Sequence, residues 1–322
     1  MPDPLALALT PQIGPQRLQQ ALPTDLSVEA VADVLGPEIA AGYARTLQSG
    51  LAEQERAQAA RLGVRLIGLW EEDYPEVLRH LESPPTVLYL KGELPPSERN
   101  IGIVGTRKAS PWATAWTHKV ARELAEAGIG IISGLALGID AAAHKGALDG
   151  GGYTLGVLGS AIDHFYPAQN RALAERMSVL SEFPLGTPPQ AGLFPRRNRI
   201  VAAFSRAVLV VEAGEKSGSL ITAKFAAELG RDVLAVPGRP GDTFSLGCPA
   251  DSGRSRAGAE HRGRAERPGD AGPQKAGRAV GGKRGQSLPG LARAPRGPAR
   301  RPRAEHRPFH WRGSLGADDA RA

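Results

Sequence analysis

The 322-residue sequence lacks the residues on which several classes of protein depend. Its single cysteine, Cys248, excludes an internal disulfide framework. Its longest apolar runs, such as residues 208–211, are far shorter than the roughly 20 residues that cross a bilayer. Residues 1–10 lack the basic region of a signal peptide. These absences predict a cytoplasmic protein with no membrane partner.

The net charge of +7 is distributed unevenly along the chain. Residues 247–322 contain 17 Lys and Arg against 7 Asp and Glu, a net charge of +10, which leaves 23 against 26, or −3, for residues 1–246. The first 246 residues are therefore slightly acidic. A nucleic-acid site in them has to depend on the local placement of arginines, because the basic character of the chain belongs to its last part.

The N-terminal residues predict a small helical domain over residues 1–60, rich in alanine and leucine at helical spacing. Residues 9–15, followed by Leu18, are similar to the turn of a helix-hairpin-helix or SAM-like domain, in which Gly14 would let the backbone approach a phosphate. A helical packing module without DNA contact is the other interpretation. Residues 61–99 are expected to form a connector.

Residues 100–246 alternate between short β-rich runs and helical stretches. Strands are predicted near residues 101–105, 129–133, 154–158, 178–181, 207–211 and 233–236. Ser110 followed by Pro111 is a good start for the first helix of this region. The alternation predicts an α/β fold, a doubly wound and mostly parallel Rossmann-like sheet with helices on both faces.

Residues 247–322 have a different composition, dominated by arginine, glycine, proline and alanine. Their Ile, Leu and Val residues are Val280, Leu288, Leu291 and Leu315, too few to offset an ordering entropy of roughly 1–2 kcal/mol per residue. We therefore expect a disordered basic tail. A frameshift near Gly247 in a GC-rich gene would give this composition; a genuine RNA- or DNA-binding tail is the competing hypothesis.

Two neighbouring segments predict a site for a polyphosphate chain. Arg196, Arg197 and Arg199 lie in four consecutive positions at the start of an apolar helix, and can collect several phosphates. On a helix Arg196 and Arg199 share a face and Arg197 points elsewhere, so one phosphate cannot take all three. Residues 216–219, Lys-Ser-Gly-Ser, open the next helix and would add free backbone N–H donors.

The carboxyl ends of the predicted strands carry further candidates, since ligands of open α/β sheets bind there. Gly105 would let a phosphate approach the backbone, Thr106 could donate its hydroxyl, and Arg107 could bind phosphate with two parallel hydrogen bonds. Ser133 and Gly134 end the second strand.

These segments resemble the DNA-processing protein A (DprA, or Smf) family. The resemblance extends in order through residues 101–107, 133–140, 144–148, 154–159, Tyr166-Pro167 with Asn170, 194–200, 217–223 and 232–238. The family's Arg-Asn-Arg pattern falls on Arg197, Asn198 and Arg199, which leaves Arg196 outside it. The chain departs from the family after Gly247-Cys248, where relatives continue with another apolar segment and often a winged-helix domain.

The resemblance implies a protein that is not an enzyme and needs no cofactor. It implies a homodimer that binds single-stranded DNA without sequence preference, protects it from nucleases and loads the RecA recombinase in natural transformation. Few aromatic residues are present, so base stacking is expected to contribute modestly. The predicted DNA-binding residues are Gly105, Thr106, Arg107, Ser133, Gly134, Asn170, Arg197, Asn198, Arg199, Lys216, Ser217, Gly218 and Ser219.

Other chemistries fit the sequence less well. Glu215 before Lys216 does not fit a P-loop, and the first turn lacks the glycine pattern of a dinucleotide site. No metal cluster is visible. Asp140 and His144 could act as acid and base, although a cap and a packed histidine are favoured. The alternative function is a nucleoside-monophosphate phosphoribohydrolase of the lysine-decarboxylase-like group, with Glu212 as its acid.

Overall fold

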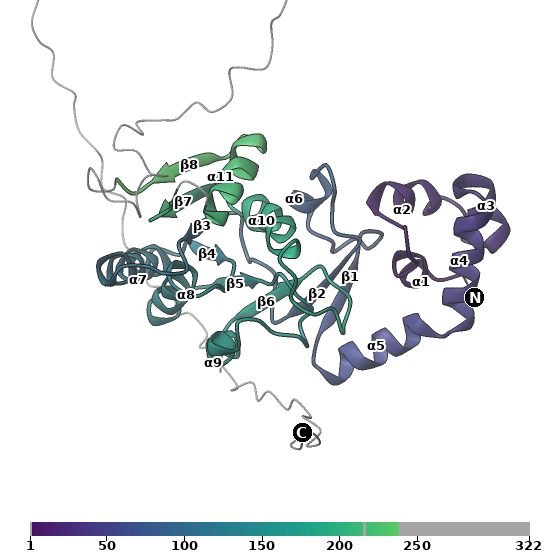
Figure 1. Cartoon of the computed structure of the whole chain (residues 1–322), viewed down its shortest axis with the longest axis horizontal. Coiled ribbons are helices and arrows are strands. Elements are labelled where there is room, and N and C mark those ends of the chain that lie inside the picture. The colour runs from purple at the N-terminus through teal and green to yellow at the C-terminus, as the bar shows by residue number, and fades with distance from the viewer. Residues whose placement is uncertain (1, 215–216, 238–322) are drawn as a thin grey trace, which may run out of the picture. The chain divides into compact units, whose positions relative to one another are not determined.

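The computed structural model describes residues 2–214 and 217–237, so the tail predicted for residues 247–322 lies outside the described residues (Figure 1). The N-terminal part is helical. Asp3 and Ser27 cap their helices by accepting backbone N–H groups. The helices are α1 (Pro4–Ala8), α2 (Pro15–Ala21), α3 (Val28–Leu35), α4 (Pro37–Gln48) and α5 (Leu51–Arg61).

The turn that resembles a helix-hairpin-helix joins α1 to α2. Leu18 is fully buried, and Gly14 precedes the first residue of α2. The left-handed residue of the turn is Gln12, with φ of 69°, whereas Gly14 has φ of −103°. No atom lies within 4 Å of the place where a β-carbon of Gly14 would be, so the described structure itself does not require glycine at this position.

A buried carboxylate joins α5 to the part of the chain that forms the sheet. Glu55 accepts hydrogen bonds from the Tyr89 hydroxyl (2.7 Å) and from the backbone N–H of Leu185 (2.8 Å). Burial, together with the neighbouring Glu55 charge, raises the pKa of the Tyr89 phenol well above its usual value. The hydroxyl therefore stays protonated and available as a donor.

One sheet contains every strand of the described residues. Its strand order is β1-β2-β6-β5-β4-β3-β7-β8, and all pairs from β6 to β8 are parallel. The sequence predicted six of these strands to within about two residues, and the doubly wound, mostly parallel α/β fold is confirmed. These six are β3 (Asn100–Gly105), β4 (Gly130–Ser133), β5 (Thr154–Val157), β6 (Ser178–Ser181), β7 (Ala207–Val211) and β8 (Asp232–Ala235).

Two further strands lie in residues 61–99, for which the sequence predicted a connector. β1 (Arg65–Gly68) pairs antiparallel with β2 (Val87–Lys91), and β2 pairs antiparallel with β6. Between them lies the short helix α6 (Glu76–Arg79). β1 has four residues and β2 has five, directly after Pro84-Pro85 and Thr86, so each carries too little local signal to predict a strand. Their pairing depends on the existing edge of β6.

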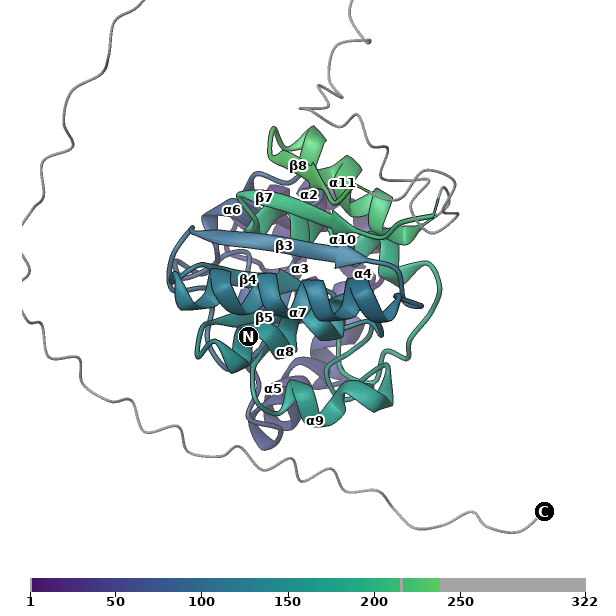
Figure 2. The same cartoon turned by 90° about the vertical axis from the view of Figure 1, so that its left-hand side faces the viewer.

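Helices cover both faces of the parallel part of the sheet. Ile103 packs in one cluster with α7 and α8, while the next residue, Val104, packs in the cluster that contains α10, as alternation along a strand requires. Figure 2 shows α7 and α8 in front of the sheet. The helices of this part are α7 (Pro111–Glu126), α8 (Ile139–Asp149), α9 (Arg171–Ala174), α10 (Leu193–Phe204) and α11 (Gly218–Glu228).

The connectivity fixes where a ligand can bind. From β3 the chain proceeds through β4, β5 and β6 on one side of the sheet, and then returns to place β7 and β8 on the other side of β3. The crevice between the carboxyl ends of β3 and β7 is therefore the topological switch point, the usual ligand position in such sheets. Among the described residues, no helix has the length and apolar content needed to span a membrane.

Candidate nucleic-acid interface

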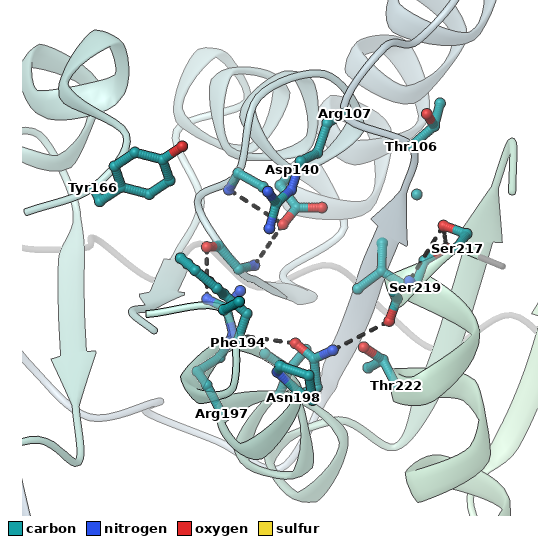
Figure 3. Close-up of a pocket in the computed structure, with 18 of the residues that line it drawn as sticks. Thr106, Arg107, Asp140, Tyr166, Phe194, Arg197, Asn198, Ser217, Ser219 and Thr222 are labelled. Carbon is teal, nitrogen blue, oxygen red and sulfur yellow. Dashed lines mark hydrogen bonds between the residues drawn. The ribbon is translucent and has the colours of Figure 1, made fainter. Parts of the chain in front are cut away.

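A pocket of about 630 Å³ lies at this switch point (Figure 3). Its walls come from the turn after β3, the loop between β4 and α8, the first turns of α10 and the first turn of α11. Of the residues predicted to bind DNA, those that line it are Gly105, Thr106, Arg107, Gly134, Arg197, Asn198, Ser217, Gly218 and Ser219. Lys216 lies outside the described residues.

Arg107 is the exposed cation of the pocket. Its guanidinium carbon lies 5.1 Å from the centre of the Phe194 ring, within the range of a cation–π interaction. Among residues 2–214 and 217–237, no carboxylate forms an ion pair with Arg107. Stacked on an aromatic ring and without a counter-ion among the described residues, this guanidinium can bind an anionic group of a ligand with two hydrogen bonds.

The start of α11 faces the same pocket. Ser217 is the N-cap of this eleven-residue helix, and its hydroxyl oxygen lies 2.7 Å from that of Ser219. The amide nitrogen of Asn198 donates to the carbonyl of Gly218 (3.2 Å), which ties the first turn of α11 to α10. The positive end of the helix dipole and the Arg107 guanidinium therefore act on one space.

Arg197 is a buried cation in the wall of the pocket, 4% exposed. Its Nη1 donates to the carbonyls of Gly134 and Val157, and its Nε donates to Asn198 Oδ1 (3.2 Å). Within the described residues its Nη2 forms no hydrogen bond. Burial lowers the pKa of Arg197 to about 10, and the side chain remains charged at neutral pH.

Asp140 shapes the loop that carries Gly134. Its carboxylate accepts from the backbone N–H groups of Gly134 (3.1 Å) and Ala136 (3.3 Å), on either side of Leu135, whose φ is 56°. A β-carbon on Gly134 would contact both Asp140 and Arg197, so glycine lets the two charged groups face each other. Burial raises the pKa of the Asp140 carboxyl, against the influence of the Arg197 charge.

His144 is a packed histidine, one helical turn after Asp140 and fully buried. Its Nδ1 lies 2.7 Å from the hydroxyl of Thr154, which donates to the carbonyl of Ile131 and so accepts from the imidazole. Its Nε2 has no hydrogen-bond partner among the described residues. His144 is therefore packed as the favoured interpretation predicted, whereas the predicted cap is wrong: Asp140 lies inside α8 and accepts from the preceding loop, and the N-cap residue of α8 is Gly138.

Three of the predicted residues lie outside the pocket wall. The Ser133 hydroxyl donates to the carbonyl of Ile103 (2.5 Å), and Asn170 Nδ2 donates to the carbonyls of Leu135 and Ala136. Arg199 is paired with the Glu182 carboxylate at 2.6 and 2.8 Å, on the far side of α10 from the pocket. Each of these side chains forms hydrogen bonds or an ion pair within the protein, so their role is to hold the segments around the pocket in place.

Gly105 has a packing reason that the sequence did not indicate. A β-carbon at this position would overlap the carbonyl oxygen of Val211 and the side chain of Ile139. The space around Gly105 is therefore filled by β7 and α8. Glycine here lets β3 approach its neighbours closely. Gly105 also lines the pocket, and the backbone contact with phosphate stays a prediction.

Two aromatic residues of the pocket were absent from the predicted site. Phe194 lies at the start of α10, and its ring centre lies 5.8 Å from that of Tyr166, which is 45% exposed (Figure 3). The signal that could have found Phe194 is its position directly before Pro195 and the arginines, since aromatic and basic residues alternate in nucleic-acid sites.

Glu212, the acid of the alternative enzyme, is tied into the fold. It is 7% exposed, and its carboxylate accepts from the backbone N–H (2.9 Å) and the hydroxyl (2.5 Å) of Ser110. Its carbonyl accepts from the N–H of Thr106. Glu212 thus connects the end of β7 to the start of α7 through hydrogen bonds, and it does not line the pocket. Among the described residues, no three His, Cys, Asp or Glu side chains gather as metal ligands would.

Comparison with known proteins identifies the family. The chain is 47% identical over 187 residues to the protein Smf of Synechocystis, a match that covers 55% of this chain and 47% of that protein, so the chain spans about half the length of this relative. The structure is similar to that of DNA processing protein A from Streptococcus pneumoniae, with a TM-score of 0.64, 33% identity, and coverage of 75% of this chain and 88% of that one.

A second solved structure, of DNA processing protein A from Helicobacter pylori, matches with a TM-score of 0.52 and 31% identity over 57% of this chain and 86% of that one. The report of that structure describes a single-stranded DNA binding mode of the Helicobacter protein. The sequence model of the DNA recombination-mediator protein A family matches residues 65–259. The resemblance drawn from the sequence is confirmed, and the chain belongs to the DNA recombination-mediator protein A family.

Proposed function

We propose that this protein binds single-stranded DNA through the pocket at the switch point, without sequence preference. The observation that carries the proposal is the convergence of three phosphate-binding features in one space: the exposed Arg107 guanidinium, the Arg197 Nη2 and the start of α11. Cations and backbone N–H groups bind the sugar–phosphate backbone and carry no sequence information of their own. A non-specific binder is what such a pocket supports.

The aromatic rings of the pocket favour single strands over duplex DNA. Phe194 and Tyr166 present ring surface beside Arg107, and a base can stack on such a surface only when it is not paired in a helix. The homologue from Helicobacter pylori, whose reported structure concerns single-stranded DNA binding, supports the same ligand class. The DNA-binding residues that we retain are Gly134, Thr106, Arg107, Arg197, Asn198, Ser217, Gly218 and Ser219.

We further propose that the bound strand is protected from nucleases and that the protein loads the RecA recombinase onto it, in transformation and recombination. Membership of a recombination-mediator family supports this role. The proposal includes a homodimer formed through the edge of the sheet at β8, where Leu234 is 49% exposed, so that two pockets hold one strand. It also includes the cytoplasmic location that the sequence predicts, since recombination takes place there.

Replacement of Arg107 by alanine tests the pocket. The loss of a charged, hydrogen-bonded contact is expected to cost about 1.5–3 kcal/mol, or roughly 10- to 150-fold in affinity. The loss should be equal for oligo-dT and a mixed-sequence oligomer, and the salt slope should shrink by about 0.7. The measurement is a fluorescence-anisotropy titration at several salt concentrations, with circular dichroism to verify folding.

Two variants control this experiment. Arg107→Lys keeps the charge but loses the planar fork, so it should recover only part of the affinity. Arg206→Ala removes an exposed arginine at the amino end of β7, the opposite end of the sheet, and should leave binding unchanged. A folded Arg107→Ala protein that binds both oligomers as tightly as the parent would show that the pocket is not the DNA site.

A further inference from the structure

A pair of tryptophans lies on the surface of α7, outside the pocket. Trp112 is 56% exposed, the largest exposure of any bulky apolar side chain among the described residues. Trp116 follows one helical turn later, and the two ring centres lie 6.2 Å apart with an angle of 24° between the ring planes. An exposed indole with a second indole behind it is costly to leave in water, and usually marks a binding surface.

The position of this pair relates it to the pocket. In Figure 2, α7 begins at the end of the sheet where β3 ends, which is the end that carries the pocket. Arg107, in the pocket wall, and Lys108, the next residue, are both exposed. Trp112 follows Arg107 by five residues, a length of chain that spans at most about 18 Å. Arg107 stacks on the Phe194 ring, and a second cation, Lys108, and the exposed Trp112 ring follow it along the chain.

Trp116 holds the pair in a fixed orientation. It packs against the apolar cluster formed by Ile103, Val211 and the inner face of α7, so its ring is anchored. Trp112 is stacked on it and presents its outer face to solvent. A rigid, exposed ring face costs little conformational entropy when a ligand stacks on it, because the side chain is already ordered.

We propose that Trp112 is a base-stacking platform for the part of the strand that leaves the pocket over Arg107 and Lys108. The inference rests on the proposed function, in that single-stranded DNA is the ligand. Cations that bind the backbone, combined with rings on which bases stack, are the means by which proteins bind a single strand without reading its sequence. Trp112 is exposed and lies in the first turn of α7, at the positive end of the helix dipole, where a phosphate next to the stacked base is stabilised.

The test combines a variant series with two lengths of oligo-dT. The full chain and its Trp112→Ala, Trp112→Phe and Arg107→Ala variants are titrated with a dinucleotide, which is short enough to bind in the pocket without reaching α7, and with a 20-nucleotide strand, which also reaches α7. Trp112→Ala is expected to bind the long strand about tenfold more weakly and the dinucleotide normally, since base stacking on an aromatic ring is worth roughly 1–3 kcal/mol. Trp112→Phe, which keeps a ring, should recover most of the loss.

Val34→Ala is the matched control, because it removes another exposed apolar side chain, on α3 and away from the pocket and from β8, and should leave DNA binding unchanged. Tryptophan fluorescence should be quenched by the 20-nucleotide strand in the parent and quenched less in Trp112→Ala. A folded Trp112→Ala protein that binds the long strand as tightly as the parent would overturn the proposal. If that protein also has a different mass from the parent in light scattering, the indole pair contacts a second copy of the chain and not DNA.

The failure of the pocket gives a different result. Arg107→Ala would then bind both lengths normally, while Trp112→Ala would still weaken the long strand, and the DNA site would lie on α7 alone. If neither variant weakens binding, both proposals are wrong. The two arms therefore report separately on the pocket and on the tryptophan platform.

Discussion

The buried ion pair of α10 gives a prediction that separates a structural arginine from a DNA-binding one. Glu182 has no exposed side-chain surface, and its carboxylate binds both terminal nitrogens of Arg199, at 2.6 and 2.8 Å. Arg199 is 8% exposed at its side chain and also donates to the carbonyl of Ser83 (2.9 Å). Replacing Glu182 with glutamine leaves this guanidinium buried without a countercharge.

The structure sets the size of the effect. Removing one member of a buried pair costs about 3–5 kcal/mol, because the remaining charge stays desolvated. With a urea slope of about 2 kcal/mol per M, the midpoint of unfolding should fall by about 1.5–2.5 M. Arg196 also contacts Glu182, at 3.1 Å, but its side chain is 55% exposed. Arg196→Ala should therefore cost at most about 1 kcal/mol.

Urea unfolding followed by circular dichroism measures both variants, and anisotropy with oligo-dT measures DNA binding under conditions where each remains folded. Glu182→Gln should lose stability and keep its DNA affinity, because Arg199 lies outside the pocket. A change in unfolding free energy below 1 kcal/mol would refute the burial argument. A gain of DNA affinity in the folded variant, whose Arg199 is no longer neutralised by the carboxylate, would show that Arg199 acts on DNA after all.

Two other predictions concern acid stability and assembly. Burial, aided by the Arg197 charge, lowers the pKa of His144 to about 3, below its unfolded value near 6.5, so the folded state binds fewer protons between these values. Stability should fall as the pH drops below about 6.5, by about 2 kcal/mol at pH 5, and urea titrations of a His144→Gln variant should lack this dependence. Light scattering at micromolar concentration should give the mass of a dimer; a monomer would contradict pairing through β8.

The parallel sheet and the motifs of the pocket could be predicted from the sequence alone. Six β-rich runs separated by helical stretches predict a doubly wound fold because each run is a local pattern, whereas the switch point between β3 and β7 follows from the spatial order of the strands. For the same reason, Arg107 could be placed after the end of a strand and Ser217 at the start of a helix. Strands β1 and β2 could not be predicted, because β1 pairs with β2 and β2 pairs with β6, which is far away in the sequence.

Which of the motif residues face the pocket depends on the tertiary structure. Arg197 and Arg199 belong to one Arg-Asn-Arg motif, yet the first lines the pocket and the second pairs with Glu182 behind it. Side chains two positions apart on a helix point about 200° away from each other. Arg197 therefore meets the carbonyls of Gly134 and Val157, whereas Arg199 meets the Glu182 carboxylate, and these partners lie in or directly after different strands. The sequence contains the arginines and the aromatic rings, but the long-range packing of β6, α8 and α10 determines which of them meet in the pocket.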